Sequence, residues 1–235
     1  MIPLRDTIRT RTVPFVTRLL VAANVAVFLL ELLQGENLDA FVETFAFVPL
    51  RFFHPELAGW TFSSAVVTIF TAMFLHGGLA HLLGNMLFLW IFGDNVEDAL
   101  GHFRFLVFYL VAGLSATLLQ AFLSPSSTIP NLGASGAIAG VLGAYFVYYP
   151  RARIVTIVPL FILFPVVELP AAVYLLGWFA LQFWMGSVQL TRAGRAAAAH
   201  GGVAFWAHVG GFALGVAWAL IVRPARRPQA TYRIV

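Results

Sequence analysis

One serine stands among glycines and alanines in residues 131–143, NLGASGAIAGVLG, within a chain otherwise made of long apolar runs. Polar side chains inside membrane spans are costly, so each is a candidate for function. Ser135 falls in the expected first turn of a helix, where unpaired backbone N–H groups and the positive end of the helix dipole can stabilise an oxyanion. The pattern predicts that Ser135 is a nucleophile held below the membrane surface.

His208 is the candidate base for this serine. It shares one helical face with Gly211 and Gly215, which follow it by three and seven residues. Small residues let membrane helices approach to near backbone contact. The serine segment carries a matching set of glycines at Gly133, Gly136, Gly140 and Gly143. If the two helices cross there, His208 can take the proton from Ser135 and return it to a leaving amine.

Three further polar residues precede this pair in the chain. His81 and Asn85 are spaced i, i+4, so both can face one cavity and donate hydrogen bonds to a developing oxyanion. Polar pairing between helices is the alternative role for them. His76 precedes His81 across two glycines and is not on the same helical face. We expect a structural or supporting role for His76.

The composition is that of a polytopic membrane protein. Of 235 residues, 60% are hydrophobic and 10% charged, and the mean hydropathy is +0.88, whereas about a quarter of residues are charged in soluble domains. The pI near 10.0 could indicate nucleic acid, but the basic residues flank apolar segments, where they orient the chain in a lipid bilayer. We therefore expect no nucleic-acid partner. The absence of cysteine excludes disulfides, thiolate metal sites and a cysteine nucleophile.

Six transmembrane helices are expected, and the fourth is short enough for its N-terminus to lie below the outer surface. Their approximate ranges are 16–33, 79–92, 103–123, 134–149, 171–185 and 203–222. Residues 34–66 mix acidic and aromatic side chains, which predicts an interfacial first outer loop that partly dips into the membrane. Three prolines argue against a regular helix in 154–170. We interpret that stretch as an inner connection lying along the membrane.

The polar residues outside the spans give the expected topology. Residues 1–15 form a basic N-terminal tail, 16–222 the membrane domain, and 223–235 a tail with four further arginines, so both termini are expected in the cytoplasm. Arg192 and Arg195, in the expected outer loop, count against this orientation. A polar cluster that includes Asp94, Glu97 and Asp98 is expected to connect the second and third helices.

Three segments carry a family resemblance: HGGLAHLLGN (76–85), GASG (133–136) and AHVGGFALG (207–215). In type, order and placement on helices two, four and six, they resemble the signature set of the rhomboid family of intramembrane serine proteases. The resemblance implies an all-α, six-helix rhomboid-like bundle with a partly membrane-embedded first loop. It also implies cleavage of single-pass transmembrane substrates by a Ser135–His208 dyad, without metal or other cofactor, with His81 and Asn85 as oxyanion stabilisers.

The resemblance assigns further roles. Gly133 and Gly136 would hold the serine turn, Gly211 the helix crossing, and Trp178 a lateral substrate gate on helix five, facing helix two. Two positions depart from the family pattern. Residues 66–70, VVTIF, replace a Trp-Arg pair of some members, and Ala139 replaces an aromatic ring that could stack on the histidine. We expect other contacts to orient His208.

Several alternatives remain open from the sequence. One is a catalytically inactive rhomboid relative that binds membrane clients, and another is a polytopic transporter. Metal transport through His76, His81 and His208 would need no serine. A zinc protease would need an HExxH pattern, which the chain lacks, and an aspartyl protease would need a partner for Asp94. The short form suggests a bacterial inner membrane, whereas the substrate and oligomeric state are not predicted.

Overall fold

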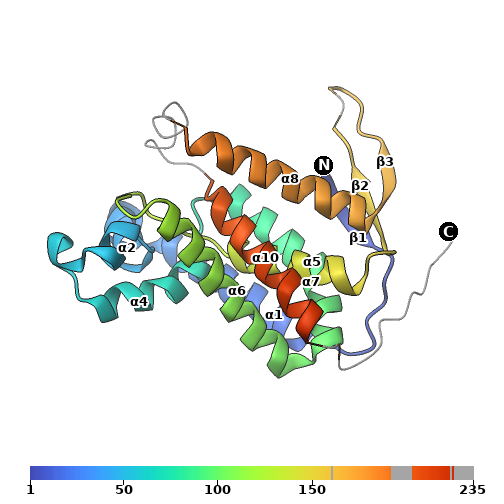
Figure 1. Cartoon of the computed structure of the whole chain (residues 1–235), viewed down its shortest axis with the longest axis horizontal. Helices are drawn as coiled ribbons and strands as arrows, with labels where there is room; N and C mark the ends of the chain where they lie inside the picture. The colour runs from blue at the N-terminus through green and yellow to red at the C-terminus, as the bar shows by residue number, and fades with distance from the viewer. Residues whose placement is uncertain (160, 192–202, 223, 225–235) are drawn as a thin grey trace.

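The computed structural model describes residues 1–159, 161–191, 203–222 and 224. Within them, six helices correspond to the predicted spans (Figure 1): α1 (Phe15–Leu33), α5 (Leu79–Leu100), α6 (His102–Leu123), α7 (Ser135–Tyr148), α8 (Ala171–Gln189) and α10 (Phe205–Ile221). By length and composition, α1, α5, α6 and α8 can each cross a membrane, while α7 and α10 are shorter apolar helices. The predicted helical membrane bundle is confirmed.

Helix α7 lies at the centre of the bundle. It packs most extensively against α10, and also against α6 and α5, and Figure 1 shows α10 lying across it. Nearly every residue from Gly136 to Tyr145 is buried, because small and apolar side chains occupy all faces of this helix. The first turn of α7, which carries Ser135, is therefore enclosed by neighbouring helices.

The predicted first outer loop is largely helical. It contains α2 (Leu38–Phe45), α3 (Pro49–Phe53) and α4 (Phe62–Thr71), and Figure 1 shows α2 and α4 together at one end of the molecule. The ring of Phe52 lies 5.8, 5.2 and 5.5 Å from those of Phe47, Phe53 and Phe62. Because aromatic pairs of this kind stabilise a compact unit, the aromatic residues of this segment pack together rather than forming an irregular loop.

Helix α5 extends beyond the predicted end at residue 92, so the prediction of a polar connection there was wrong. Glu97 is fully buried and accepts hydrogen bonds from the Val16 N–H at 2.8 Å and from the N–H and Oγ1 of Thr17, both at 2.7 Å. His102 Nδ1 lies 2.5 Å from the same carboxylate. A carboxylate at a helix N-terminus is stabilised by the unpaired N–H groups and the helix dipole. The acidic cluster therefore continues α5 and anchors the start of α1.

A small antiparallel sheet lies at the end of the bundle opposite α2 and α4 (Figure 1). Its strands, in the order β1-β2-β3, are β1 (Ile2–Asp6), β2 (Arg153–Ile157) and β3 (Val166–Pro170). β1 pairs Ile2 with Ile157, and β2 pairs Ile154 with Leu169. Residues 2–6, within the predicted N-terminal tail, thus form a strand. β2 and β3 form an antiparallel hairpin, because β-branched residues favour strands and Pro165 and Pro170 fall at the two ends of β3.

The exposed tip of this hairpin is apolar. Phe161 and Ile162 are fully or almost fully exposed, and the next two residues, Leu163 and Phe164, are also exposed. Membrane contact by this connection stays a prediction. The predicted tail 223–235, apart from Pro224, and the loop residues Arg192 and Arg195 lie outside the described residues.

Candidate active site

The hydroxyl of Ser135 and the imidazole of His208 form a hydrogen bond. Ser135 Oγ lies 2.8 Å from His208 Nε2. Ser135 is the first residue of α7, and His208 lies in the first turn of α10. The ring is buried, with 8% of the residue exposed. Two residues that are 73 positions apart in sequence therefore meet at the end of the α7–α10 contact.

Two glycines of α10 make this contact possible. A methyl group added at Gly211 would lie 2.0 Å from the Gly136 carbonyl oxygen, and one at Gly215 would lie 2.0 Å from that of Gly140. Neither distance is possible for non-bonded atoms. Positions 211 and 215 therefore require glycine, as the predicted helix crossing demanded.

The glycines of α7 lie against α10 as predicted, and a methyl group at Gly143 would lie 2.2 Å from the Phe212 carbonyl oxygen, but two of them have a second close neighbour. Added methyl groups at Gly136 and Gly140 would meet the side chains of Ala116 and Ala112 on α6, at 2.6 and 2.5 Å. The Cα hydrogens of these two glycines therefore face α6, and their carbonyl groups face α10. The sequence did not predict that α6 packs so closely against α7.

The other nitrogen of His208 is bonded to α8. His208 Nδ1 lies 2.8 Å from the side-chain oxygen Oε1 of Gln182. Sequence reasoning missed Gln182. It was detectable by the same criterion that selected the histidines, because it is a polar side chain within an apolar span.

Trp178 lies one turn before Gln182 on α8. Its ring centroid is 5.7 Å from that of His208 and 6.3 Å from that of Phe212, so the indole packs against α10. The resemblance had it face helix two. In this position its ring contacts the histidine from α8. The aromatic residue that Ala139 replaces would contact it from α7. It also lines the cavity described below.

His81 and Asn85 present unused hydrogen-bond donors. The Gly77 N–H donates to His81 Nδ1 at 3.3 Å, so the hydrogen of the neutral ring resides on Nε2. Asn85 Nδ2 is buried and has no hydrogen-bond partner within the described residues. Gly133 has a φ of +119°, and a methyl group there would lie 2.8 Å from His81 Nε2. Glycine is therefore required immediately before the serine turn.

These groups surround one cavity of about 780 Å³ between α5, α7, α8 and α10. The polar residues in its wall are Asn131 and the five already described: His81, Asn85, Ser135, Gln182 and His208. Much of the remaining wall is apolar, with Phe88, Ile138 and Leu142 among its residues. Its size and mixture of apolar surface with a few polar groups are typical of ligand sites.

His76 lies outside this wall. Its N–H donates to the Glu31 carboxylate at 3.0 Å, and its Nδ1 lies 3.2 Å from the Phe74 carbonyl oxygen. Its ring centroid is 5.1 Å from that of His81. These contacts tie the turn before α5 to α1, which supports the expected structural role.

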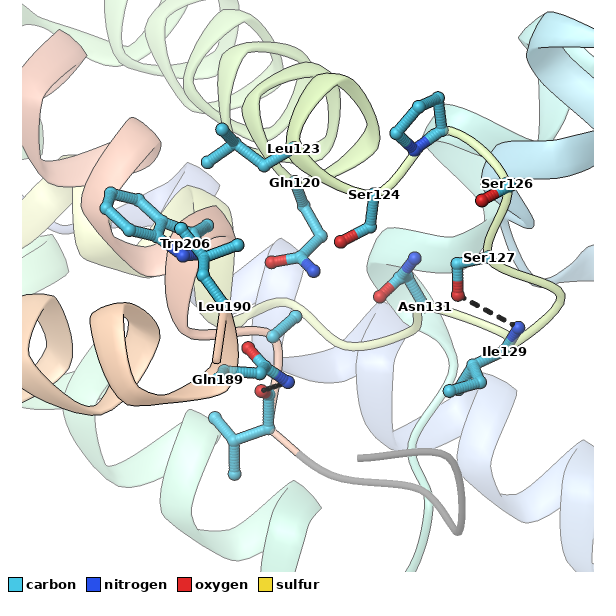
Figure 2. Close-up of a pocket in the computed structure, with 13 residues that line it drawn as sticks. Gln120, Leu123, Ser124, Ser126, Ser127, Ile129, Asn131, Gln189, Leu190 and Trp206 are labelled. Atoms are coloured by element: carbon cyan, nitrogen blue, oxygen red, sulfur yellow. Dashed lines mark hydrogen bonds between the residues drawn. The ribbon is translucent and has the colours of Figure 1, made fainter. Parts of the chain in front are cut away.

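A second pocket of about 450 Å³ lies where α6 ends, next to the facing ends of α8 and α10 (Figure 2). Gln120, Gln189 and Trp206 are among its lining residues, and Ser127 Oγ accepts a hydrogen bond from the Ile129 N–H at 3.2 Å. Neither Ser135 nor His208 lines this pocket. It shares Asn131, Val203 and Ala204 with the wall of the cavity that holds the serine–histidine pair, so the two adjoin.

The fold and this geometry define a polytopic helical membrane protein with a serine–histidine pair whose histidine is buried. The family model described as the Rhomboid domain matches residues 63–225. The chain belongs to the rhomboid family. It is therefore an integral membrane protein of a family of intramembrane proteases that act on transmembrane substrates.

Individual relatives match parts of the chain. It is 46% identical to Rhomboid protease GluP of Bacillus subtilis over 76 residues, which are 32% of this chain and 14% of that protein. It is 31% identical to Rhomboid protein 1, mitochondrial, of Saccharomyces cerevisiae over 172 residues, 72% of this chain and 45% of that protein. It is 32% identical to RHOMBOID-like protein 6, mitochondrial, of Arabidopsis thaliana over 160 residues, which are 57% of this chain and 52% of that protein. The chain thus spans about half or less of these relatives.

Proposed function

We propose that the protein is an intramembrane serine endopeptidase that cleaves single-pass transmembrane substrates. The observation that carries the proposal is the 2.8 Å hydrogen bond between Ser135 Oγ and His208 Nε2 in a cavity of a rhomboid-family protein. A serine hydroxyl becomes an effective nucleophile when an adjacent base accepts its proton. Ser135 is the nucleophile in this proposal and His208 the general base.

The first half of the reaction transfers an acyl group to the enzyme. Ser135 Oγ attacks the scissile carbonyl carbon while its proton passes to His208 Nε2. The carbonyl oxygen becomes an oxyanion, which accepts hydrogen bonds from Asn85 Nδ2, His81 Nε2 and the N–H groups of the first turn of α7. The imidazolium then gives its proton to the amine nitrogen, the C–N bond breaks, and an acyl ester remains on Ser135.

The second half regenerates the enzyme. A water molecule attacks the ester while His208 Nε2 accepts its proton. The C–O bond to Ser135 breaks, the serine oxygen recovers a proton from the imidazolium, and a carboxylic acid product leaves. Every proton moves through one ring nitrogen, so no metal or other cofactor enters the proposed cycle.

The substrate class and location complete the proposal. The apolar wall of the cavity, with Phe88 and Leu142, suits a peptide that arrives from the lipid phase. We place both termini in the cytoplasm on the basis of the flanking arginines, and the proposal takes the membrane to be a bacterial inner membrane.

Covalent labelling tests this proposal against an inactive relative that only binds membrane clients. Detergent-solubilised wild type should react with a fluorophosphonate probe at Ser135, and Ser135→Ala should not react. An inactive relative would leave the wild type unlabelled. Equal labelling of the two proteins would also overturn the assignment of the nucleophile.

A further inference from the structure

We infer that Gln182 is a positioning residue that fixes the tautomer and orientation of His208, so that the active site is a hydrogen-bonded chain of three residues rather than two, with proton transfer confined to Ser135 and His208. The inference rests on the proposed function and deepens it. Gln182 lies outside the three segments that carry the family resemblance, and its contact with His208 points to it.

The hydrogen-bond chemistry carries the first step. A carboxamide oxygen can only accept a hydrogen bond, so His208 Nδ1, at 2.8 Å from Gln182 Oε1, must carry a hydrogen. In a neutral imidazole, the other nitrogen then has the free lone pair. That nitrogen is Nε2, which faces the Ser135 hydroxyl at 2.8 Å. The glutamine therefore selects the tautomer that a general base needs.

The surroundings of Gln182 carry the second step. The residue is 8% exposed and lies in a helix that is otherwise almost entirely apolar. A buried carboxamide without a partner destabilises a fold, and one in a membrane span is costlier still. His208 Nδ1 is a partner that offsets this cost. The same bond becomes stronger when the ring is charged in the transition state, because hydrogen bonds from charged donors are stronger than neutral ones.

Helix α8 is held against α10 on both sides of Gln182, which makes the contact a fixed one. Phe179 stacks on Phe212 with ring centroids 4.7 Å apart, and Phe183 lies 5.5 Å from Trp206. The Trp206 Nε1–H also donates to the Gly186 carbonyl oxygen at 3.0 Å. Contacts on both sides of Gln182 in sequence thus keep its side chain at the histidine.

A neutral glutamine and a carboxylate would act differently on the base, and this difference makes the role testable. A glutamate at position 182 would accept the same hydrogen bond and would also stabilise the imidazolium by its charge. The base would then hold its proton to higher pH. A methionine has similar length but offers no comparable acceptor, so both tautomers would become populated.

The test compares Gln182→Met, Gln182→Glu and a control, Gln189→Met, in detergent. Gln189 lies on the same helix two turns later, and its Nε2 donates to Val203 rather than to the histidine. The readouts are the rate of fluorophosphonate labelling at Ser135 as a function of pH, and the thermal unfolding midpoint. We expect Gln182→Met to label about 10-fold more slowly, as the loss of one orienting hydrogen bond suggests. Gln189→Met should label at the wild-type rate.

The glutamate variant separates positioning from packing. Gln182→Glu should recover labelling at high pH and lose it at a higher pH than the wild type as the solution is acidified. If Gln182 has only a structural role, the pH dependence of labelling at Ser135 should be the same in every variant that folds. That result would overturn this inference but not the proposed function. If Gln182→Met does not fold, the pH profile of Gln182→Glu decides. No labelling of the wild type would overturn the proposed function itself.

Discussion

Gly211 of α10 lies directly against the backbone of Gly136 of α7, the residue after the proposed nucleophile. A methyl group on Gly211 would lie 2.0 Å from the Gly136 carbonyl oxygen and 3.0 Å from its carbonyl carbon. His208 is three residues earlier on the same helix. The distance between the serine and the histidine is therefore set by the absence of a side chain at position 211.

Replacing Gly211 with Ala should separate the two helices. We expect a loss of about 1–3 kcal/mol in the free energy of unfolding from overpacking, together with a loss of at least about 100-fold in cleavage rate, because small displacements in an active site have large effects. Thermal unfolding and cleavage of a model transmembrane substrate measure the two effects. Gly177→Ala is the matched control, since an added methyl group there meets nothing within 4 Å. Wild-type turnover by Gly211→Ala would contradict the importance of this contact.

The role of Asn85 can be separated from helix pairing. Its buried Nδ2 has no hydrogen-bond partner within the described residues, so Asn85→Ala should leave thermal stability nearly unchanged. If Asn85 donates a hydrogen bond to the oxyanion, its replacement should lower kcat by about 10²–10³-fold with little change in KM. Steady-state kinetics on a model transmembrane substrate measure both constants. If the variant instead loses stability and keeps its kcat, Asn85 pairs helices.

Trp178 has two expected roles with opposite outcomes. As a gate, its truncation would admit substrate more easily and raise the cleavage rate in proteoliposomes. Its ring, however, lies 5.7 Å from that of His208, so we expect Trp178→Ala to lower the rate by loosening the base. Phe183→Ala, on the same helix but in contact with Trp206, is the control for general loosening of α8. A faster Trp178→Ala enzyme would restore the gate interpretation.

The sequence predicted the spans well because long apolar runs carry a strong signal. It predicted the close approach of α7 and α10 from the spacing of Gly211 and Gly215 after His208. A helical face of small residues is typical of tightly packed helix pairs in membranes. It could not show that Gly136 and Gly140 face α6, because a glycine has no side chain whose type would identify its neighbour.

The parts that sequence reasoning missed depend on partners distant in the chain. Glu97 was expected in a polar connection after a helix ending near residue 92, and only the N–H groups of Val16 and Thr17 account for its buried carboxylate within α5. Gln182 was overlooked because, although polar within an apolar span, it belongs to no spaced set such as that of His208, Gly211 and Gly215. Its partner is 26 residues away on another helix. The strand at 2–6 likewise forms only because residues near 155 pair with it.

Glu97 should contribute to stability rather than to chemistry. Glu97→Gln would keep one acceptor oxygen but replace the other with an N–H₂ group facing the N–H groups of Val16 and Thr17. We expect the free energy of unfolding to fall by about 2 kcal/mol, the contribution of hydrogen bonds to a charged group. Denaturation in mixed micelles measures this change. Fluorophosphonate labelling per folded molecule should stay at the wild-type rate, and a selective loss of labelling would show a link to the active site.

Asp6 should make stability depend on pH. Its carboxylate accepts hydrogen bonds from Tyr145 Oη at 2.5 Å and from Asn95 Nδ2 at 2.8 Å. Burial of the group outweighs the opposing effect of the Tyr145 hydrogen bond and raises the pKa of Asp6 from 3.8 to about 6. Because the pKa is higher in the folded state, the contribution to stability is fully present below about pH 4 and is lost as the pH rises through about 6. Acidification from about pH 7 should therefore stabilise the wild type relative to a variant without this carboxyl.

Asp6→Asn is that variant, since its amide keeps an acceptor for Tyr145 and does not titrate. The measurement is the thermal unfolding midpoint of both proteins in detergent from about pH 4 to about pH 7. The Asp94 carboxyl group interacts electrostatically with Asp6, so the difference between the two curves reports the charge of Asp6 together with its interaction with Asp94. We expect the wild-type midpoint to fall relative to that of Asp6→Asn as the pH rises through about 6. Parallel curves would show that Asp6 titrates at its ordinary pKa, and that its burial against Tyr145 does not affect the proton equilibrium.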